Sequence, residues 1–395
     1  MKKLLFVIPT MRMGGAEKSL VALLSKIDPT QFDLTLLLFA AEGELLESLP
    51  SYVKVISLPI EECAMVLEGR FYFKYLIRKF HWWRAVVRCI VAIMDRLQSK
   101  RKQKKWLSWN LYKGVIAKLP GHYDAAISYL EGTTACYVID KVTADRKIGW
   151  IHTDFSSQLR SFSKEYSYYA EFDRLVTISE ICRNGFARHY PNLRSRMTVI
   201  ENLIDKKYIL NSAQAFIPSN KDETTACLVT VGRLEAIKGI DLAIQTAAIM
   251  RQRGFLFRWY IYGGGYMLQQ FTNMIEQLEL QDVVLLEGSV TNPYPFIKQA
   301  DIVVQPSRYE GKSIVLDEAK VLGKPIVVTN YTSVKDQIEN DVTGVIVEMN
   351  PESIADGIIA LYQDQNKMKL LSENCRKCAD NADKVITKFL MLFGK

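Results

Sequence analysis

Short apolar runs alternate with longer amphipathic stretches along this chain. The runs are almost continuously apolar and end at glycine or polar residues, as buried parallel strands do. Stretches with helical spacing separate them, which is the order of elements in a doubly wound α/β fold. The predicted strands are 3–9, 32–39, 53–58, 123–129, 147–151, 174–178 and 197–201 in the first half, and 226–231, 257–262, 283–287, 302–305, 325–329 and 344–347 in the second.

This strand and helix pattern starts twice, which indicates two domains. A chain of 395 residues is also too long for one ordinary hydrophobic core. We expect a Rossmann-like domain over residues 1–204, a polar linker over 205–224, a second Rossmann-like domain over 225–378 and a terminal helix over 379–395.

Composition places the chain among soluble globular enzymes, with 49% apolar and 24% charged residues. The N-terminus begins Met1-Lys2-Lys3 and turns apolar, as a signal peptide would, but the run breaks at Pro9 and no small-residue cleavage site follows. No run reaches the roughly 18 apolar residues that a spanning helix needs. We therefore expect a cytoplasmic protein.

Seven cysteines, an odd number scattered over the chain, do not predict a disulfide framework. Cys375 and Cys378 form a C-x-x-C pair without a second pair or a nearby histidine. We expect them to be thiols on a helix surface in a reducing compartment, with no zinc or redox role.

Residues 70–105 are unusually basic, with twelve lysines and arginines against a single acid, Asp95. This excess is larger than the net charge of +8 of the whole chain. Aromatic residues such as Trp82 and Trp83 interleave with the cations, so we expect a helical insert over about 70–110 that contacts an anionic membrane surface. A helical hairpin with a solvated basic face is the alternative. Nucleic acid is not expected, because no recognition motif accompanies the patch.

The stretch 307–319 joins a predicted strand to a predicted helix and carries two glutamates. The helix should run from Ser313 as N-cap to Gly323. Glu310 lies in the loop ahead of it, and Glu318 follows Ile314 by one turn on the same face. Amides at a helix N-terminus attract a diphosphate, and carboxylates accept paired hydrogen bonds from vicinal hydroxyls. The stretch predicts a nucleotide-sugar site; solvated charges are the alternative for two glutamates alone.

Two cations, Arg233 and Lys238, flank the loop after the first strand of the second half. Strand ends of a parallel sheet share one edge, so these cations and the amides at Ser313 would form a diphosphate clamp that needs no metal. No D-x-D pair occurs in the sequence, and we expect no metal and no other cofactor. Gly263 opens a run of three glycines after another strand, which is a weak signal by itself.

The first half offers fewer candidates. Gly14 and Gly15 follow the first strand, where glycine permits close approach to a ligand, although a plain tight turn explains them equally well. His152 and Asp154 follow the strand 147–151, at the sheet edge where parallel sheets bind ligands. A structural histidine bonded to a carbonyl is the alternative for His152.

Together these features resemble the retaining glycosyltransferases of family 4, which have the GT-B fold. The resemblance covers essentially the whole chain and rests on residues 9–18, Gly232-Arg233-Leu234, Lys238-Gly239, Gly263–Gly265, Gly288 and the E-x7-E pair Glu310 and Glu318. It implies two Rossmann-like domains that face a cleft, with the C-terminal helix crossing back to the N-terminal domain.

The resemblance also implies a role for each candidate residue. Glu310 would contact the donor sugar, Glu318 the ribose, and Arg233 and Lys238 the diphosphate, whose developing charge they would offset. Backbone amides around the sugar and diphosphate would come from Gly311, Lys312, Ser313, Ile314 and Val315, with Gly15 and Gly263 also on the donor side. Gly14, His152 and Asp154 would lie on the acceptor side, with His152 approaching the sugar.

Two residues depart from the family pattern. Lys312 stands where an aromatic or aliphatic residue is common, and Asp317 beside Glu318 is not general. Lys312 is left with three possible environments: the donor phosphate, the diphosphate of the acceptor, or solvent.

The run 309–328 is most similar to bacterial enzymes of capsule, exopolysaccharide and O-antigen synthesis, whose acceptor is a polyprenyl-diphosphate-linked sugar. The implied reaction is transfer of a hexose from a UDP-sugar, or with less support a GDP-sugar, with retention, by a protein peripheral on the inner face of the cytoplasmic membrane. A sugar-nucleotide epimerase or hydrolase on the same fold is one alternative. A non-catalytic membrane-bound partner of another transferase is the other.

Overall fold

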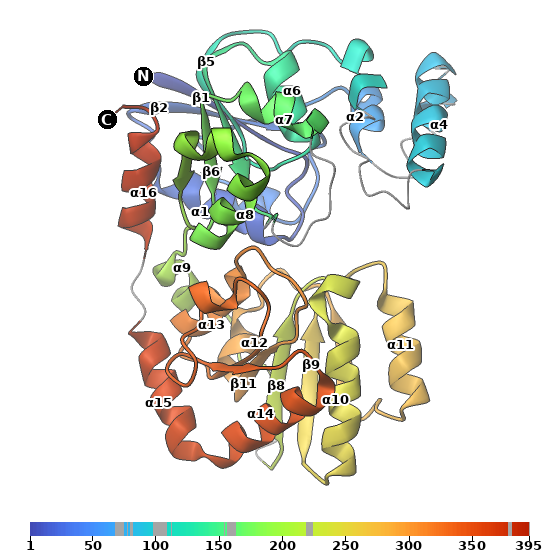
Figure 1. Cartoon of the computed structure of the whole chain (residues 1–395), viewed down its shortest axis with the longest axis vertical. Coiled ribbons are helices and arrows are strands. Elements are labelled where there is room, and N and C mark those ends of the chain that lie inside the picture. Colours follow the sequence, from blue (N-terminus) through green and yellow to red (C-terminus); the bar gives the residue numbers. More distant parts are fainter. Residues whose placement is uncertain are drawn as a thin grey trace. The chain divides into compact units, whose positions relative to one another are not determined.

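The computed structural model describes residues 1–67, 75–76, 78–79, 82–97, 109–111, 113–153, 155, 163–218, 224–377 and 381–394, with the backbone alone for 91–97 and 163–166. Contacts divide the chain into two compact units, shown in Figure 1. The first unit contains Met1–Leu203 and Lys384–Lys395, and the second contains Ile204–Asp383.

The first unit is built on a seven-stranded parallel sheet of order β3-β2-β1-β4-β5-β6-β7. Its strands are β1 (Lys2–Ile8), β2 (Phe32–Leu38), β3 (Lys54–Ser57), β4 (Tyr123–Ser128), β5 (Ala144–Ile151), β6 (Arg174–Thr177) and β7 (Met197–Val199). Its helices include α1 (Gly15–Lys26), α2 (Ile60–Val66), α4 (Trp82–Leu97), α6 (Thr133–Lys141), α7 (Ser163–Ala170), α8 (Glu180–His189) and α16 (Ala382–Met391).

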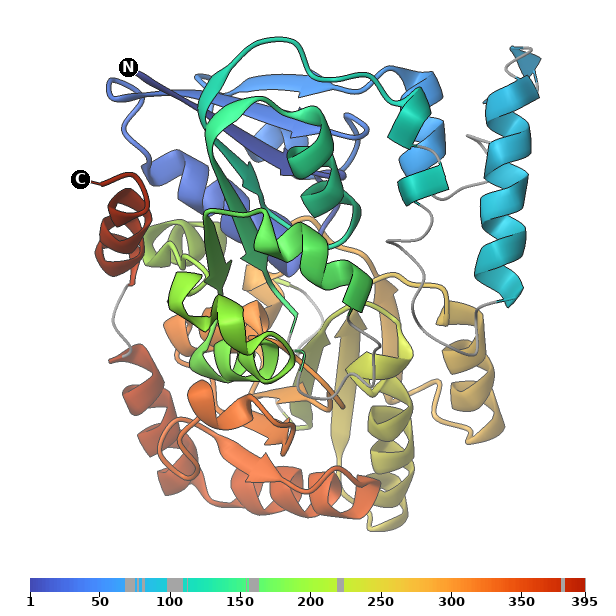
Figure 2. The ribbon, with the colours of Figure 1, turned by 45° about the horizontal axis from the view of Figure 1, so that its top comes forward.

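Side chains of alternate residues of β1 point to opposite faces of this sheet. Leu5 and Val7 belong to the core formed with α2, α4, α6 and α8. Phe6 points to the other face, where its ring stacks on Phe389 of α16 at 6.0 Å. Lys388 of α16 also donates a hydrogen bond to the carbonyl of Val199 at 2.9 Å. The C-terminal helix therefore packs on the first unit, as predicted, and both views in Figures 1 and 2 show it there.

The second unit has a six-stranded parallel sheet of order β10-β9-β8-β11-β12-β13. Its strands are β8 (Ala226–Val231), β9 (Phe257–Tyr262), β10 (Val284–Gly288), β11 (Ile302–Gln305), β12 (Ile326–Thr329) and β13 (Val345–Val347). Its helices include α9 (Lys206–Ser212), α10 (Ile240–Gln252), α11 (Leu268–Gln277), α12 (Tyr294–Gln299), α13 (Ile314–Val321), α14 (Pro351–Gln363) and α15 (Gln365–Arg376).

Helices cover both faces of this second sheet. One core joins the sheet to α10, α11 and α14, and the other joins it to α9, α12 and α13. Two parallel sheets, each between layers of helices, confirm the predicted α/β doubly wound class. Every predicted strand is present, with ends that differ by a few residues.

Two expectations about this unit need correction. The segment expected as a linker contains α9, whose Ile209 and Ala213 are buried in the second unit, so it is part of that core. Cys375 is fully buried rather than on a surface, and its thiol donates to the carbonyl of Thr343 at 3.2 Å. Cys378 lies outside the described residues.

The basic insert is described only in part, mainly through α4, which lies beside α2 in Figures 1 and 2. Its two described arginine side chains point to the domain: Arg88 donates to the carbonyl of Leu67 at 2.7 Å, and Arg84 lies 4.0 Å from Glu61. The exposed face of the helix is instead apolar, with Trp82 56% and Trp83 70% exposed. The described part of α4 therefore does not show the solvated basic face that was the alternative to membrane contact, and most cations of the insert lie outside the described residues. No described helix is long and apolar enough to cross a membrane.

Candidate functional site

Two loops of the second unit meet where its strand order reverses. Loop 232–239 follows β8 and loop 306–313 follows β11, and these two strands are neighbours in the sheet. The chain leads from β8 outward to one edge of the sheet and from β11 outward to the other, which makes this pair of strands the switch point of the sheet. Such switch points are where doubly wound sheets bind ligands.

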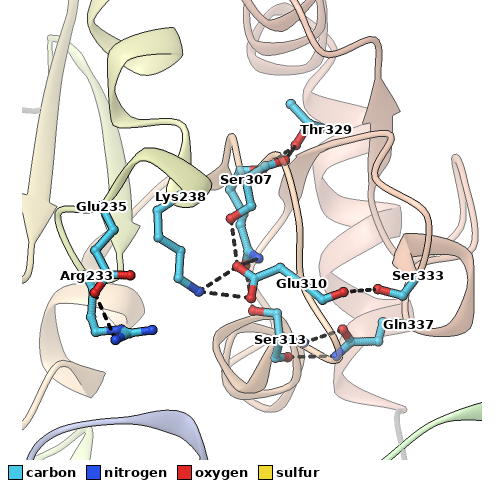
Figure 3. Close-up of polar contacts among 10 residues, drawn as sticks. Arg233, Glu235, Lys238, Ser307, Glu310, Ser313, Thr329, Ser333 and Gln337 are labelled. Atoms are coloured by element: carbon cyan, nitrogen blue, oxygen red, sulfur yellow. Dashed lines mark hydrogen bonds and ion pairs between the residues drawn. The ribbon is translucent and has the colours of Figure 1, made fainter. Parts of the chain in front are cut away.

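An ion pair joins the two loops. Lys238 Nζ lies 2.7 Å from Oε1 and 2.9 Å from Oε2 of Glu310, as Figure 3 shows. Both side chains are largely buried, with 22% of Lys238 and 11% of Glu310 exposed. The structure thus brings together one predicted cation and one predicted carboxylate.

Glu310 is held by further donors. Ser307 Oγ donates to Oε1 at 2.7 Å, and Gln305 Nε2 donates to the same oxygen at 3.0 Å. Ser333 Oγ donates to the backbone carbonyl of Glu310 at 2.7 Å. The bonds from Ser307 and Gln305 fix the carboxylate in one position, and its remaining lone pairs can accept further hydrogen bonds.

Arg233 does not join this cluster. Its guanidinium lies 2.9 Å from Glu235, its side chain is 59% exposed, and Figure 3 shows its only drawn contact to be with Glu235. Arg233 and Lys238 therefore lie on the same loop but pair with different carboxylates, Glu235 and Glu310.

The two loops are also fastened through their backbones. Arg308 makes a bidentate pair with Asp241 at 2.7 and 2.6 Å, and its amide donates to the carbonyl of Ile237 at 2.8 Å. Gly239 has φ +65°, and a Cβ there would lie 1.9 Å from the carbonyl oxygen of Pro306. Only glycine fits this close approach of loop to loop.

Gly263 serves a similar packing purpose beside β8. A Cβ at this residue would lie 1.8 Å from the carbonyl oxygen of Gly232, and the amide of Leu234 donates to the carbonyl of Gly264 at 2.9 Å. The glycine run therefore lets the loop after β9 pack directly against the loop that carries Arg233.

Helix α13 begins where it was predicted, with Ser313 at the N-cap position, but the reason differs. Ser313 Oγ does not cap the helix; it donates to Gln305 Oε1 at 2.8 Å. The amide and carbonyl of Ser313 are both bonded at 2.7 Å to the side chain of Gln337. Gln305 and Gln337 thus position the turn Gly311–Ser313 and, beyond it, Ile314 and Val315 at the start of the helix.

Lys312 is not solvated. Its side chain is 8% exposed and lies 3.9 Å from Asp317, which is also paired with Lys320 at 2.9 Å. Of the three environments left open for Lys312, solvent is wrong. Lys312 and Asp317, the two unusual residues, therefore belong to one internal charge cluster that also contains Lys320.

Glu318 is almost completely buried, at 1% exposure, and accepts a hydrogen bond from Tyr294 Oη at 2.9 Å. Burial and the adjacent carboxylate raise the pKa of Tyr294, so its hydroxyl stays a donor. Glu318 is therefore buried in the middle of α13 and held by a hydrogen bond. The alternative of a solvated glutamate is excluded.

His152 follows β5 in the first unit, at the sheet edge where it was expected. Its ring lies 5.1 Å from that of Tyr129, and its Nε2 is buried without a hydrogen-bond partner among the described residues. Burial lowers the pKa of His152 to about 4, against the opposing effects of Glu131 and of a hydrogen bond with the backbone of Tyr129. The imidazole is neutral at neutral pH and has one nitrogen still able to take a partner.

Glu131, which the sequence reasoning missed, fixes the turn that carries His152. Its carboxylate accepts from the amide of His152 at 3.1 Å and from the hydroxyl of Thr153. Asp154, the other acceptor-side candidate, lies outside the described residues. Gly14 is the N-cap of α1 and Gly15 its first residue, so the glycine pair opens this helix rather than forming a longer loop before it.

The supporting side chains Tyr294 and Glu131 had no separate signal in the sequence, because each acts through a partner about 20 residues along the chain. Gln305 offered a faint one, as a polar residue that ends an apolar strand. Among the described residues, no group of three or more His, Cys, Asp or Glu side chains is arranged to hold a metal ion.

Comparison with known proteins finds a family match within the second unit. Residues 211–382 match the profile of the glycosyl transferases group 1. The chain is 29% identical over 172 residues to a poly(ribitol-phosphate) alpha-N-acetylglucosaminyltransferase of Staphylococcus aureus, covering 42% of this chain and 34% of that protein.

A second relative matches more of the chain. It is the N-acetylgalactosamine-N,N'-diacetylbacillosaminyl-diphospho-undecaprenol 4-alpha-N-acetylgalactosaminyltransferase of Campylobacter jejuni, 25% identical over 266 residues, with 67% of this chain and 70% of that protein covered. The chain thus spans about a third of the length of the first relative and just over two thirds of the second.

Among solved structures, HepE of Anabaena in complex with UDP and glucose aligns over 100% of both chains, with a TM-score of 0.72 and 15% identity. At this identity the likeness is one of fold. The whole chain therefore has the GT-B fold that the sequence predicted.

Proposed function

We propose that this chain, whose residues 211–382 are a glycosyl transferases group 1 domain, is a retaining hexosyltransferase of family 4. The donor is a UDP-sugar, and the acceptor is a glycan linked to polyprenyl diphosphate in bacterial surface polysaccharide synthesis. The Campylobacter relative, whose name specifies a diphospho-undecaprenol acceptor, supports the lipid-linked acceptor. HepE, which was crystallised with UDP and glucose, supports the donor.

The observation that carries this proposal is the ion pair of Lys238 and Glu310 at the switch point of the second sheet. In this pair, the ammonium group of Lys238 donates hydrogen bonds to the carboxylate of Glu310. A bound diphosphate competes for the ammonium group, and Glu310 then turns its lone pairs to the hydroxyls of the sugar. In the donor complex, Lys238 therefore binds the diphosphate, and Glu310 binds the sugar on the other side of the bond that breaks.

The remaining donor contacts follow from the same loops. Arg233, exposed on the loop of Lys238, supplies a second positive charge for the diphosphate, and the amides at the start of α13 add to the clamp. Glu318, held by Tyr294, accepts the ribose hydroxyls. We assign neutral His152 to hydrogen bonding with a sugar hydroxyl, which its unpartnered Nε2 can make without adding a competing positive charge.

Transfer proceeds by front-face substitution. The bond from the anomeric carbon to the diphosphate oxygen breaks, and the acceptor oxygen bonds to the same face of that carbon. The proton of the acceptor hydroxyl passes to the departing diphosphate, whose charge Lys238 and Arg233 offset. Glu310 does not act as the nucleophile in this scheme, because its carboxylate accepts hydrogen bonds from Ser307 and from the sugar hydroxyls.

A donor panel tests this function. Purified protein is incubated with UDP- and GDP-hexoses and a short-chain polyprenyl-diphosphate sugar, and products are identified by mass. We expect one UDP-hexose to add one hexose, with the anomeric configuration of the donor kept by NMR. Inversion would refute the mechanism. Release of free UDP and free sugar without acceptor would instead show a hydrolase, and failure of any nucleotide sugar to bind would favour a non-catalytic partner.

We also propose that α4 contacts the anionic membrane that carries this acceptor. Its exposed face contains Trp82, Trp83, Val86 and Ile90, each between 45% and 70% exposed, and tryptophan is suited to the membrane interface. The basic excess of residues 70–105 supplies the attraction to anionic lipid.

Vesicle sedimentation tests the membrane contact. Replacing Trp82 and Trp83 with Gln should reduce binding to phosphatidylglycerol vesicles by about tenfold or more, because two interfacial aromatic anchors are lost. The control is Leu256→Gln, a 66% exposed apolar residue of the second unit, which should leave binding unchanged. Unaltered binding of the double variant would show that α4 is not the contact.

A further inference from the structure

A second concave site lies in the second unit, apart from the loops after β8 and β11. It is a cavity of about 510 Å³ between α9, α12, the end of α13 and the end of α15. Figure 1 shows these four helices on one side of the unit. None of the candidate donor residues lines it, so the proposed reaction leaves this cavity unused.

Four cations converge on this cavity: Lys206, Lys298, Lys324 and Arg376. They come from four different segments of the fold, and no carboxylate lines the cavity in the part of the chain that the structure describes. Lys206 donates a hydrogen bond to the carbonyl of Arg376 at 3.4 Å, and Lys324 donates one to the carbonyl of Ala300 at 2.8 Å. Like charges gathered in this way repel one another and attract an anion.

The rest of the lining is mostly apolar. Leu210, Ala213, Val321 and Leu322 form one wall, of which the last three are buried and belong to the core under the sheet. A volume of about 510 Å³ is in the range of small-molecule sites, far more than one inorganic phosphate fills. The lining therefore suits a ligand with an anionic head and an apolar part.

We propose that this cavity binds an anionic amphiphile such as a phosphorylated lipid or a soluble phosphorylated compound with a hydrocarbon portion. The anionic group lies between Lys298 and Arg376, and the apolar part lies against Leu210 and Leu322. This inference is independent of the proposed sugar transfer, since it uses none of the donor residues.

The place of the cavity gives its occupant access to both connections between the two units. Lys206 begins α9, which directly follows the passage from Leu203 to Ile204. Arg376 ends α15, shortly before the chain returns to the first unit at Lys384. The amide of Ile204 donates to Asn381 Oδ1 at 3.0 Å, which ties the two connections together. An occupant is therefore expected to stiffen both.

Titration of the full chain with dihexanoyl phosphatidic acid, below its micelle concentration, tests the site. We expect the double variant Lys298→Gln/Arg376→Gln to bind it at least about tenfold more weakly than wild type, since two charged contacts are lost. The matched control is Lys369→Gln/Arg258→Gln, two exposed cations of the same unit outside the cavity, which should bind as wild type does. Inorganic phosphate should bind at least tenfold more weakly than the lipid.

Undiminished binding by the cavity variant, or equal weakening in the control, would overturn the site. Equal affinity for inorganic phosphate would overturn the amphiphile. Sedimentation with phosphatidic acid vesicles then assigns the source: loss of vesicle binding in the cavity variant indicates bilayer lipid, and vesicle binding as in wild type indicates a soluble ligand. UDP binding is followed in parallel, and its retention in the cavity variant separates this site from the donor site.

Discussion

At the scale of single residues, the candidate site is a set of side chains whose positions are fixed by neighbours before any ligand arrives. Glu310 is bonded to Lys238, Ser307 and Gln305, and Glu318 to Tyr294. Prepositioned charges of this kind act on a transition state without a cost of reorganisation at the moment of reaction.

Replacing Glu310 by Gln should lower kcat/KM for the donor about 100-fold or more, because the amide accepts weaker hydrogen bonds and leaves Lys238 without its counter-charge. Steady-state kinetics with the UDP-sugar measures this. Glu352→Gln, an exposed carboxylate in the first turn of α14, is the control and should be neutral. A Glu310 variant that turns over normally at saturating donor would argue against contact with the reacting sugar.

Tyr294→Phe removes only the hydroxyl that holds Glu318. The donor KM should rise about fivefold to tenfold with kcat little changed, because the loss is confined to ground-state binding of the ribose. Tyr266→Phe, at a residue that is 79% exposed, should change neither constant. A fall in kcat with unchanged KM would place Glu318 near the reaction centre instead.

His152 makes stability depend on pH. Its pKa is about 4 in the folded protein and about 6.5 when unfolded, so the unfolded chain binds the proton first as pH falls. Stability should therefore decline from pH 6.5 towards pH 4, and His152→Gln should remove that part of the decline. Urea unfolding at pH 7 and pH 5 measures the difference; parallel losses in both proteins would show that His152 is not buried in neutral form.

At the scale of elements, the loop after β8 and the loop after β11 form one unit of structure. Arg308 and Asp241 clamp them, and the close approach of Gly239 to Pro306 leaves no room for a side chain. The relation of Lys238 to Glu310 depends on this contact, so backbone changes far from any charged group should disturb the site.

Gly239→Ala should destabilise the second unit by about 2–4 kcal/mol, because it adds a clash with Pro306 to the strain of a positive φ. Gly254→Ala is a matched control, since Gly254 has φ +72° but open space around it, and should cost only about 1 kcal/mol. Chemical denaturation compares the two. Equal costs would mean that the loops do not pack as tightly as the structure indicates.

The elements themselves could be predicted from the sequence, and their side-chain partners could not. An apolar run such as Ile302–Gln305 predicts a strand buried on both faces, because the signal consists of consecutive residues and needs no distant partner. Ser313 marks the start of α13, but its bonds go to Gln305 and Gln337, which come near only when β11 and the turn after β12 are assembled. Cys375 likewise reads as a surface thiol until α15 packs over Thr343.

At the scale of the whole molecule, the chain forms its first unit from both ends. Residues Lys384–Lys395 return to the unit that begins at Met1, and Phe389 of α16 is completely buried against Phe6. The first unit is therefore not complete until Phe389 and its helix have been made.

Phe389→Ala should destabilise the first unit by about 3–5 kcal/mol through loss of a buried aromatic ring. Met391→Ala on the same helix, at a residue that is 63% exposed, should cost less than about 0.5 kcal/mol. Thermal unfolding measures both. A Phe389 variant as stable as wild type would mean that α16 does not support the first unit in solution.

The central claim is that the second unit holds the nucleotide diphosphate beside Lys238 and Glu310. Calorimetric titration of UDP into the full chain tests it most directly, with Lys238→Gln beside Lys369→Gln, an exposed cation of α15, as control. We predict that UDP binds wild type and the control alike and binds Lys238→Gln at least about tenfold more weakly, through loss of a charged contact. UDP binding that is absent from wild type, or undiminished in Lys238→Gln, would contradict the claim.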